Sequence, residues 1–143
     1  MDKKALTEAD IRTKFITPAI AGKWDVMSQV LEECRFTMGR VIVRGKMTSR
    51  GKARKADYIL FYKPNIPLAI VEAKDNNHSV GAGMQQALDY AETLDVPFAY
   101  SSNGDAFLEH DRVATAGAVE REIPLDEFPS PEELCSAIAS PGA

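Results

Sequence analysis

The sequence predicts an α/β protein with a mixed central sheet of about five strands flanked by helices. Two apolar runs, 56–62 and 68–74, stand on either side of a turn that contains proline and asparagine, which is the pattern of two adjacent strands. Apolar residues with helical spacing follow over 84–94, and another apolar run occupies 98–102. A strand, a helix and a second strand in this order predict a parallel crossover connection.

The N-terminal part of the chain is predicted to be helical from Thr7. Thr7 and Asp10 have the spacing of a capping box, and the apolar residues that follow recur on one helical face. Pro18 is expected to break or restart this helix, with Thr17 able to cap the second part. The apolar residues of 24–31 again have helical spacing and are expected to pack in the core.

Two further strands are predicted before the central hairpin, at 35–37 and 41–46. The polar stretch 48–55 is expected to be a loop that leads into the strand at 56–62.

The second half of the chain continues with turn and helix signals. Asn103-Gly104 predicts a hairpin turn between 98–102 and 106–110. The stretch 112–124 reads as irregular, with room for one edge strand. Ser130 is expected to cap a C-terminal helix that has proline at its first position.

Charged residues interrupt the two central strands. Asp57 lies in the first run, and Glu72 and Lys74 lie at the end of the second. Pairing of these strands places Asp57 opposite either Glu72 or Ala73, and the sequence leaves these two registers open. One register gathers two carboxylates and an ammonium at a strand edge. Carboxylate oxygens suit Mg²⁺, the metal stabilises charge on a phosphate and activates water, and a lysine can orient or deprotonate that water.

These residues carry a resemblance to a known family. Asp57, the triplet Glu72-Ala73-Lys74, and Gln86 with Tyr90 four residues later resemble the PD-(D/E)XK nuclease superfamily. A wider ordered set resembles the N-terminal nuclease region of the restriction subunits of Type I restriction enzymes: Glu8-Ala9-Asp10, Ile16-Thr17-Pro18, Ile42-Val43-Arg44-Gly45-Lys46, Glu72-Ala73-Lys74-Asp75-Asn76-Asn77, Met84-Gln85-Gln86-Ala87-Leu88-Asp89-Tyr90-Ala91 and Ser101-Ser102-Asn103-Gly104. Ala56 stands where a proline often precedes the first aspartate.

The resemblance implies a restriction-endonuclease-like core and Mg²⁺-dependent cleavage of DNA, with Mn²⁺ able to substitute. Asp57 and Glu72 would bind the metal, the Ala73 carbonyl would add a ligand, and Lys74 would act on water. Gln86 and Tyr90 would support the site. Further partners would be the modification and specificity subunits, and ATP would act only through motor domains absent from this chain.

Glu8 has two interpretations. By resemblance, it matches an acid on the first helix that reaches the metal site in this superfamily. The alternative is that Glu8 only stabilises the helix N-terminus electrostatically. Arg12, four residues later, could pair with Glu8 on the same helical face.

The charge distribution is more informative than the net charge of −4. Seven basic residues and no acid lie between positions 40 and 55, whereas nine acids and two arginines follow from Asp105 to the end. The basic run is either a solvated loop or, beside the carboxylates, a surface that contacts DNA phosphates. Its members are Arg40, Arg44, Lys46, Arg50, Lys52, Arg54 and Lys55.

Length and composition predict one soluble globular domain, 1–143, without a membrane span, a signal peptide or metal-site cysteine spacing. The resemblance implies that this single domain is an endonuclease of the cytoplasm. The chain contains no Walker-type nucleotide loop, so we expect either an N-terminal fragment of a larger restriction subunit or a free-standing relative. Two other functions remain open from the sequence. One is a non-cleaving nucleic-acid-binding or docking module on the same fold, and the other is a stand-alone repair or junction nuclease.

Overall fold

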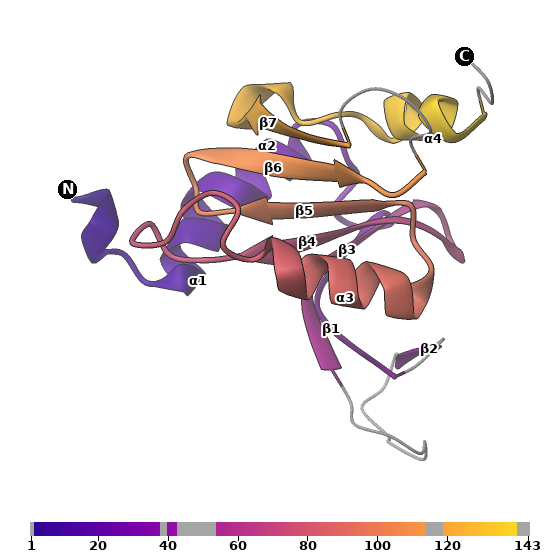
Figure 1. Ribbon diagram of the computed structural model, residues 1–143, viewed down its shortest axis with the longest axis horizontal. Coiled ribbons are helices and arrows are strands. Elements are labelled where there is room, and N and C mark those ends of the chain that lie inside the picture. Colours follow the sequence, from indigo (N-terminus) through magenta and orange to yellow (C-terminus); the bar gives the residue numbers. More distant parts are fainter. Residues whose placement is uncertain (1, 38–39, 43–53, 114–118, 140–143) are drawn as a thin grey trace.

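The computed structural model describes residues 2–37, 40–42, 54–113 and 119–139, which form one mixed sheet with helices on both faces (Figure 1). Within these residues the sheet has seven strands in the order β2-β1-β3-β4-β5-β6-β7. Their bounds are β1 Val30–Thr37, β2 Arg40–Ile42, β3 Arg54–Lys63, β4 Ile66–Ala73, β5 Phe98–Ser102, β6 Ala106–Asp111 and β7 Glu120–Pro124.

The predicted α/β class with a mixed, helix-flanked sheet is confirmed. Strands β4 and β5 are parallel, and the other neighbouring strands are antiparallel. The connection between β4 and β5 contains the helix α3, as the sequence predicted. The sheet is larger than expected because the N-terminal strands pair with β3 and the predicted edge strand forms as β7.

Helices cover the two faces of the sheet from different parts of the chain. In Figure 1, α3 lies in front of the sheet and the segment α1–α2 lies behind it. The helical elements are η1 Lys3–Ala5, α1 Glu8–Ile11, the π-helical turn η2 Arg12–Ile16, α2 Thr17–Ala21, α3 Met84–Leu94, η3 Leu125–Glu127 and α4 Pro131–Ala139. No helix in the described ranges has both the length and the apolar character needed to cross a membrane.

Each face of the sheet buries its own apolar cluster. Residues of the N-terminal helices and α4 pack with Tyr58, Val71 and Tyr100 on one side. On the other side, residues of α3 pack with Ile59, Ile70 and Cys34. β4 is buried along almost its whole length, which explains why its apolar run is continuous rather than alternating.

The start of the N-terminal helix follows the prediction, but its middle does not. Thr7 and Asp10 form the expected capping box. The chain then passes through the π-helical turn before α2, where Pro18 occupies an early position. Thr17 does not cap α2, because its hydroxyl is 2.7 Å from the hydroxyl of Tyr58.

The helical spacing of 24–31 does not produce a helix, and of its apolar residues only Trp24 and Val30 are buried in the core as expected. Trp24 is buried as predicted, but the side chain of Met27 is 90% exposed and that of Leu31 is 42% exposed. The carboxylate of Asp25 accepts hydrogen bonds from the N–H of Met27 and the hydroxyl of Ser28, which forms a turn. The short side chain of Asp25 competes with helical hydrogen bonding, and β1 begins directly afterwards.

Candidate active site at the open end of the β3–β4 hairpin

The register of β3 and β4 brings the two acidic residues together. The regular pairing ends at Tyr58 and Val71, so the next residues, Asp57 and Glu72, stand opposite each other. Here two hydrogen bonds from backbone N–H groups to carboxylate oxygens replace the backbone-to-backbone hydrogen bonds of the two strands. The N–H of Asp57 donates to Oε2 of Glu72 at 2.8 Å, and the N–H of Ala73 donates to Oδ2 of Asp57 at 2.8 Å. Of the two registers left open by the sequence, the structure therefore has Glu72 opposite Asp57.

Glu72 is buried at this position, with only 3% of its surface exposed. Burial and, next, the negative charge of Asp57 raise the pKa of Glu72 to about 8. The N–H of Asp57 and the charge of Lys74 oppose this shift but do not cancel it. A buried acid beside a second acid is costly when both are ionised, so the pair favours either a shared proton or a bound cation.

Glu8 and Lys74 lie within electrostatic reach of the pair. Burial and then the charge of Asp57 raise the pKa of Glu8, while Lys74 and Arg12 oppose the rise. Arg12 does not form the predicted ion pair with Glu8; its guanidinium instead contacts Glu32 at 3.0 Å. Glu32 of β1 and Tyr58 of β3 are paired neighbours in the sheet. Arg12 therefore pairs with an acid on a strand, which the spacing of residues along the helix could not predict.

The predicted pair on α3 is also formed. Nε2 of Gln86 donates to the hydroxyl of Tyr90 at 2.6 Å. The ring of Tyr90 packs edge-on against Phe36, with centroids 4.9 Å apart. These residues share a pocket of about 830 Å³ with Lys74, and the pocket is lined by Arg54, Lys55, Lys74, Ala82, Gln85, Gln86, Asp89 and Tyr90. Lys74 links the pocket to the carboxylate pair, because it lines the pocket and its charge acts on Glu72, whereas Asp57 and Glu72 are not among the lining residues.

Two residues without an assigned role in the sequence fix α3 against the site. The hydroxyl of Ser101 donates to the carbonyl of Val80 at 2.8 Å and accepts the N–H of Gly83 at 2.9 Å. A Cβ on Gly83 would lie 3.0 Å from Oγ of Ser101 and 3.3 Å from Cβ of Glu72. In the sequence, Gly83 could be seen only as a glycine directly before a helix. That pattern does not show which strand the start of the helix contacts.

Only part of the predicted DNA-contacting set can be placed. Arg54 pairs with Asp89 at 3.0 Å, and Lys55 pairs with Glu33 at 3.2 Å. Both basic side chains line the pocket. Arg40 belongs to the short strand β2, and the other predicted residues lie outside the described residues: Arg44, Lys46, Arg50 and Lys52.

Asp57 and Glu72 suit a hard cation such as Mg²⁺, which prefers oxygen ligands. Their two negative charges lie close together, with Glu72 buried, so a bound cation would relieve the repulsion between them. Asp57 and Glu72 each use one oxygen to accept a backbone N–H. The second oxygen of each carboxylate accepts no hydrogen bond from a described residue. In the described part of the chain no group of three or more His, Cys, Asp or Glu side chains is arranged to hold a metal ion, so Glu8 stands near the pair without completing such a group.

Comparisons with known proteins point to one class of enzyme. A family described as the second domain of the Type I restriction enzyme EcoKI endonuclease subunit matches residues 31–96. The Type I restriction enzyme EcoAI endonuclease subunit of Escherichia coli is 50% identical over 131 residues, which cover 90% of this chain and 16% of that protein.

A solved structure agrees with this likeness. It is a fragment described as an HsdR subunit of a type I restriction enzyme from Vibrio vulnificus YJ016, with a TM-score of 0.76 and 41% identity over 94% of this chain and 25% of that chain. The chain thus spans only 16% of the length of the curated relative. Identity of this extent over most of its length makes the chain homologous to a segment of the Type I restriction endonuclease subunit.

Proposed function

We propose that this chain is the Mg²⁺-dependent endonuclease domain of a Type I restriction subunit and cleaves phosphodiester bonds of DNA. The observation that carries the proposal is the meeting of Asp57 and Glu72 at the open end of the β3–β4 hairpin, with Lys74 beside them. Homology to a segment of the endonuclease subunit supports the same reaction.

The residues of the chain have distinct roles in this proposal. Asp57 and Glu72 hold the cation, and the carbonyl of Ala73 adds an oxygen from the same strand. When bound, Mg²⁺ stabilises negative charge on the phosphate and makes water a better nucleophile. Lys74 orients the attacking water or stabilises the developing charge, because an ammonium donates hydrogen bonds but accepts none.

The surrounding elements supply substrate contacts. Gln86 and Tyr90, joined by their mutual hydrogen bond, line the pocket that also contains Lys74 and present polar groups to the substrate there. The basic residues between positions 40 and 55 contact phosphates, which positions DNA without reading its sequence. Target choice therefore comes from the modification and specificity subunits, and ATP acts through motor domains elsewhere in the larger subunit.

The test uses the assembled Type I complex that contains this segment. Asp57→Ala and Lys74→Ala should each reduce DNA cleavage by at least about 100-fold, because each removes a group that acts on the reacting phosphate. ATP hydrolysis and translocation on the same DNA serve as the control and should stay near the wild-type rate. Cleavage by the Asp57→Ala complex at the wild-type rate would show that the assignment is wrong.

A further inference from the structure

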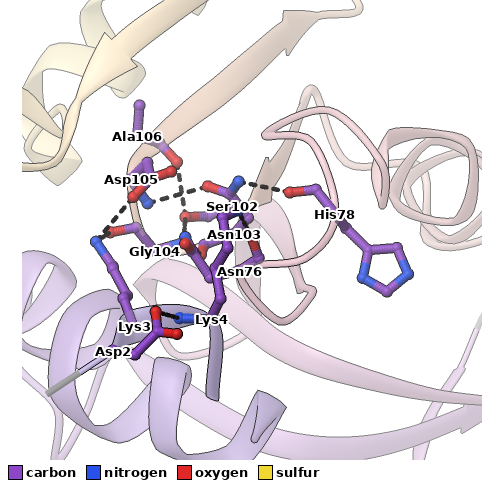
Figure 2. Close-up of polar contacts among 10 residues, drawn as sticks. All are labelled: Asp2, Lys3, Lys4, Asn76, His78, Ser102, Asn103, Gly104, Asp105 and Ala106. Atoms are coloured by element: carbon purple, nitrogen blue, oxygen red, sulfur yellow. Dashed lines mark hydrogen bonds and ion pairs between the residues drawn. The ribbon is translucent and has the colours of Figure 1, made fainter. Parts of the chain in front are cut away.

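The N-terminal segment is tied to two loops that follow the central strands (Figure 2). Nζ of Lys3 donates to the carbonyl of Gly104 at 2.7 Å and pairs with Asp105 at 2.9 Å. Nζ of Lys4 donates to the carbonyl of Asn76 at 2.9 Å. The segment before α1 is therefore anchored both to the loop after β4 and to the turn between β5 and β6.

Two buried asparagines join these loops to each other. Asn76 and Asn103 are 5% and 4% exposed. Nδ2 of Asn76 donates to the carbonyl of Asn103 at 2.9 Å, and Nδ2 of Asn103 donates to the carbonyl of His78 at 2.7 Å. These hydrogen bonds resist displacement of the loops, because breaking one of them in a buried place leaves a polar group unsatisfied. We call Lys3, Lys4, Asn76 and Asn103 the polar clamp.

The polar clamp is directly connected to the candidate active site along the chain and through the sheet. Asn76 is two residues after Lys74, and the N–H of Lys74 donates to the carbonyl of Ser102, the neighbour of Asn103, at 2.9 Å. Figure 2 shows both asparagines between the N-terminal lysines and the loop that carries His78. A shift of these loops would therefore be transmitted to Lys74 and to the segment before α1 together.

α1 is also held directly against the turn and the sheet. Gly104 has φ +90°, and a Cβ there would lie 2.9 Å from Cγ2 of Ile11. The guanidinium of Arg12 lies over the ring of Tyr58, 5.0 Å from its centroid. Tyr58 follows Asp57, and Glu8 is one helical turn before Arg12 on the same face. The helix thus holds Glu8 within electrostatic reach of Asp57, whose negative charge helps to raise the pKa of Glu8.

We propose that the polar clamp positions Glu8 beside the Asp57–Glu72 pair, so that its negative charge strengthens cation binding without Glu8 being a ligand in this conformation. Lys3, Lys4, Asn76 and Asn103 are then positioning residues. The inference rests on the proposed function, because it concerns the cation that Asp57 and Glu72 are proposed to hold.

The clamp lysines make a diagnostic test possible because two effects have opposite signs. Removing positive charge from this region would by itself strengthen the binding of a cation. Releasing Glu8 from the pair would weaken it. Weaker binding after loss of Lys3 and Lys4 is therefore the signature of positioning rather than of charge.

The experiment measures Mn²⁺ binding to the chain from the electron paramagnetic resonance signal of free Mn²⁺, with and without a short DNA duplex. The double variant Lys3→Met with Lys4→Met should bind Mn²⁺ about tenfold more weakly, in the range found when groups around metal ligands are changed. Lys14→Met is the matched control, since it removes an exposed lysine from the same helical segment. Asn77→Ala, which removes a 2.8 Å bond to the carbonyl of Lys4, should weaken binding in the same direction.

A double-mutant cycle decides whether the effect passes through Glu8. In the Glu8→Gln background the lysine variant should change Mn²⁺ affinity by less than about twofold, because the charge it positions is already gone. An undiminished loss in that background, or unchanged affinity in the wild-type background, would overturn the clamp inference. Thermal unfolding of each variant confirms that the fold is retained.

Failure of the proposed function gives a different result. Wild-type binding that is lost in Asp57→Ala supports the metal site, whatever the clamp variants do. Absence of Mn²⁺ binding by the wild-type chain both with and without duplex would overturn the metal site and the clamp inference together. If the wild-type chain binds Mn²⁺ and the clamp variants bind it with the same affinity, the clamp inference alone is overturned.

Discussion

Glu72 has the least favourable environment for a charge among the site residues. Its carboxyl is almost fully buried and faces Asp57, and both factors raise its pKa, to about 8. The sequence could show that an acid ends an apolar run. It could not show how deeply that acid is buried, because the burial comes from α3 and from neighbouring strands.

Stability should therefore depend on pH through Glu72. The folded state holds the Glu72 proton up to pH about 8, whereas the ordinary value is 4.5. Without metal, stability should fall as the pH rises from 4.5 to about 8, because the folded state binds more protons than the unfolded state there. Glu72→Gln should remove this fall and stabilise the metal-free chain at pH 8 by more than about 1.4 kcal/mol, the equivalent of one pKa unit.

Urea unfolding at pH 5 and pH 8 measures this difference. Glu92→Gln, at an exposed position of α3, is a control for the loss of one carboxylate. Equal unfolding midpoints for wild type and Glu72→Gln at pH 8 would contradict the raised pKa.

Cation binding should also release a proton. Below pH 8, Glu72 must lose its proton before both carboxylates can hold Mn²⁺. Apparent affinity should therefore increase between pH 6.5 and pH 8 and then level off. Calorimetric titration in two buffers with different ionisation enthalpies measures the proton release, which should disappear in Glu72→Gln.

At the scale of elements, the close approach of α3 to β4 sets the shape of the site. The approach depends on Gly83, which has no side chain to separate the helix from Glu72, and on the Ser101 hydroxyl. Helical periodicity predicted α3 and the shared face of Gln86 and Tyr90. It could not predict which strand receives the first turn of the helix, because that contact joins residues 18 apart in sequence.

Gly83→Ala should disturb the site while Gly81→Ala should not. A methyl group at Gly83 meets Ser101 and Glu72 at 3.0 and 3.3 Å, so we expect destabilisation of about 1–3 kcal/mol and weaker Mn²⁺ binding. At Gly81 the new methyl group meets only the end of the flexible Leu108 side chain, at 2.8 Å. Denaturant unfolding and Mn²⁺ titration of the two variants test this contrast, and equal effects would disprove it.

At the scale of the whole molecule, charge is divided between regions. The chain carries a net charge of −4, yet seven basic residues and no acid lie between positions 40 and 55. The acidic C-terminal part includes β6, β7 and α4. DNA bound at the candidate site would therefore approach from the side of β3, which contains Arg54 and Lys55 of the basic run and is separated from β6 and β7 in the sheet, so that repulsion from the acidic part is smallest.

This arrangement predicts salt-dependent DNA binding. Replacing Lys46, Arg50 and Lys52 by Gln should weaken duplex binding for all sequences alike, because phosphate contacts carry no base information. The slope of log K against log salt should decrease by about 0.9 for each lost contact. Fluorescence anisotropy over a range of salt concentrations measures the slope, with Lys23→Gln as the control. An unchanged slope would assign the basic run to a solvated loop.

The sequence by itself determined the α/β class, the order of the central elements and the identity of the charged residues in β3 and β4. These follow from local patterns such as apolar runs, helical spacing and turn residues. The helical spacing of 24–31 did not produce a helix because a local turn around Asp25 outweighed the apolar spacing.

Only the tertiary structure decided what those residues do together. It selected the register that places Glu72 rather than Ala73 opposite Asp57, paired Arg12 with Glu32 instead of Glu8, and joined the N-terminal lysines to the loops after β4 and β5. Each of these contacts joins residues distant in the chain. Their outcome depends on packing, burial and charge in three dimensions, which local sequence patterns do not encode.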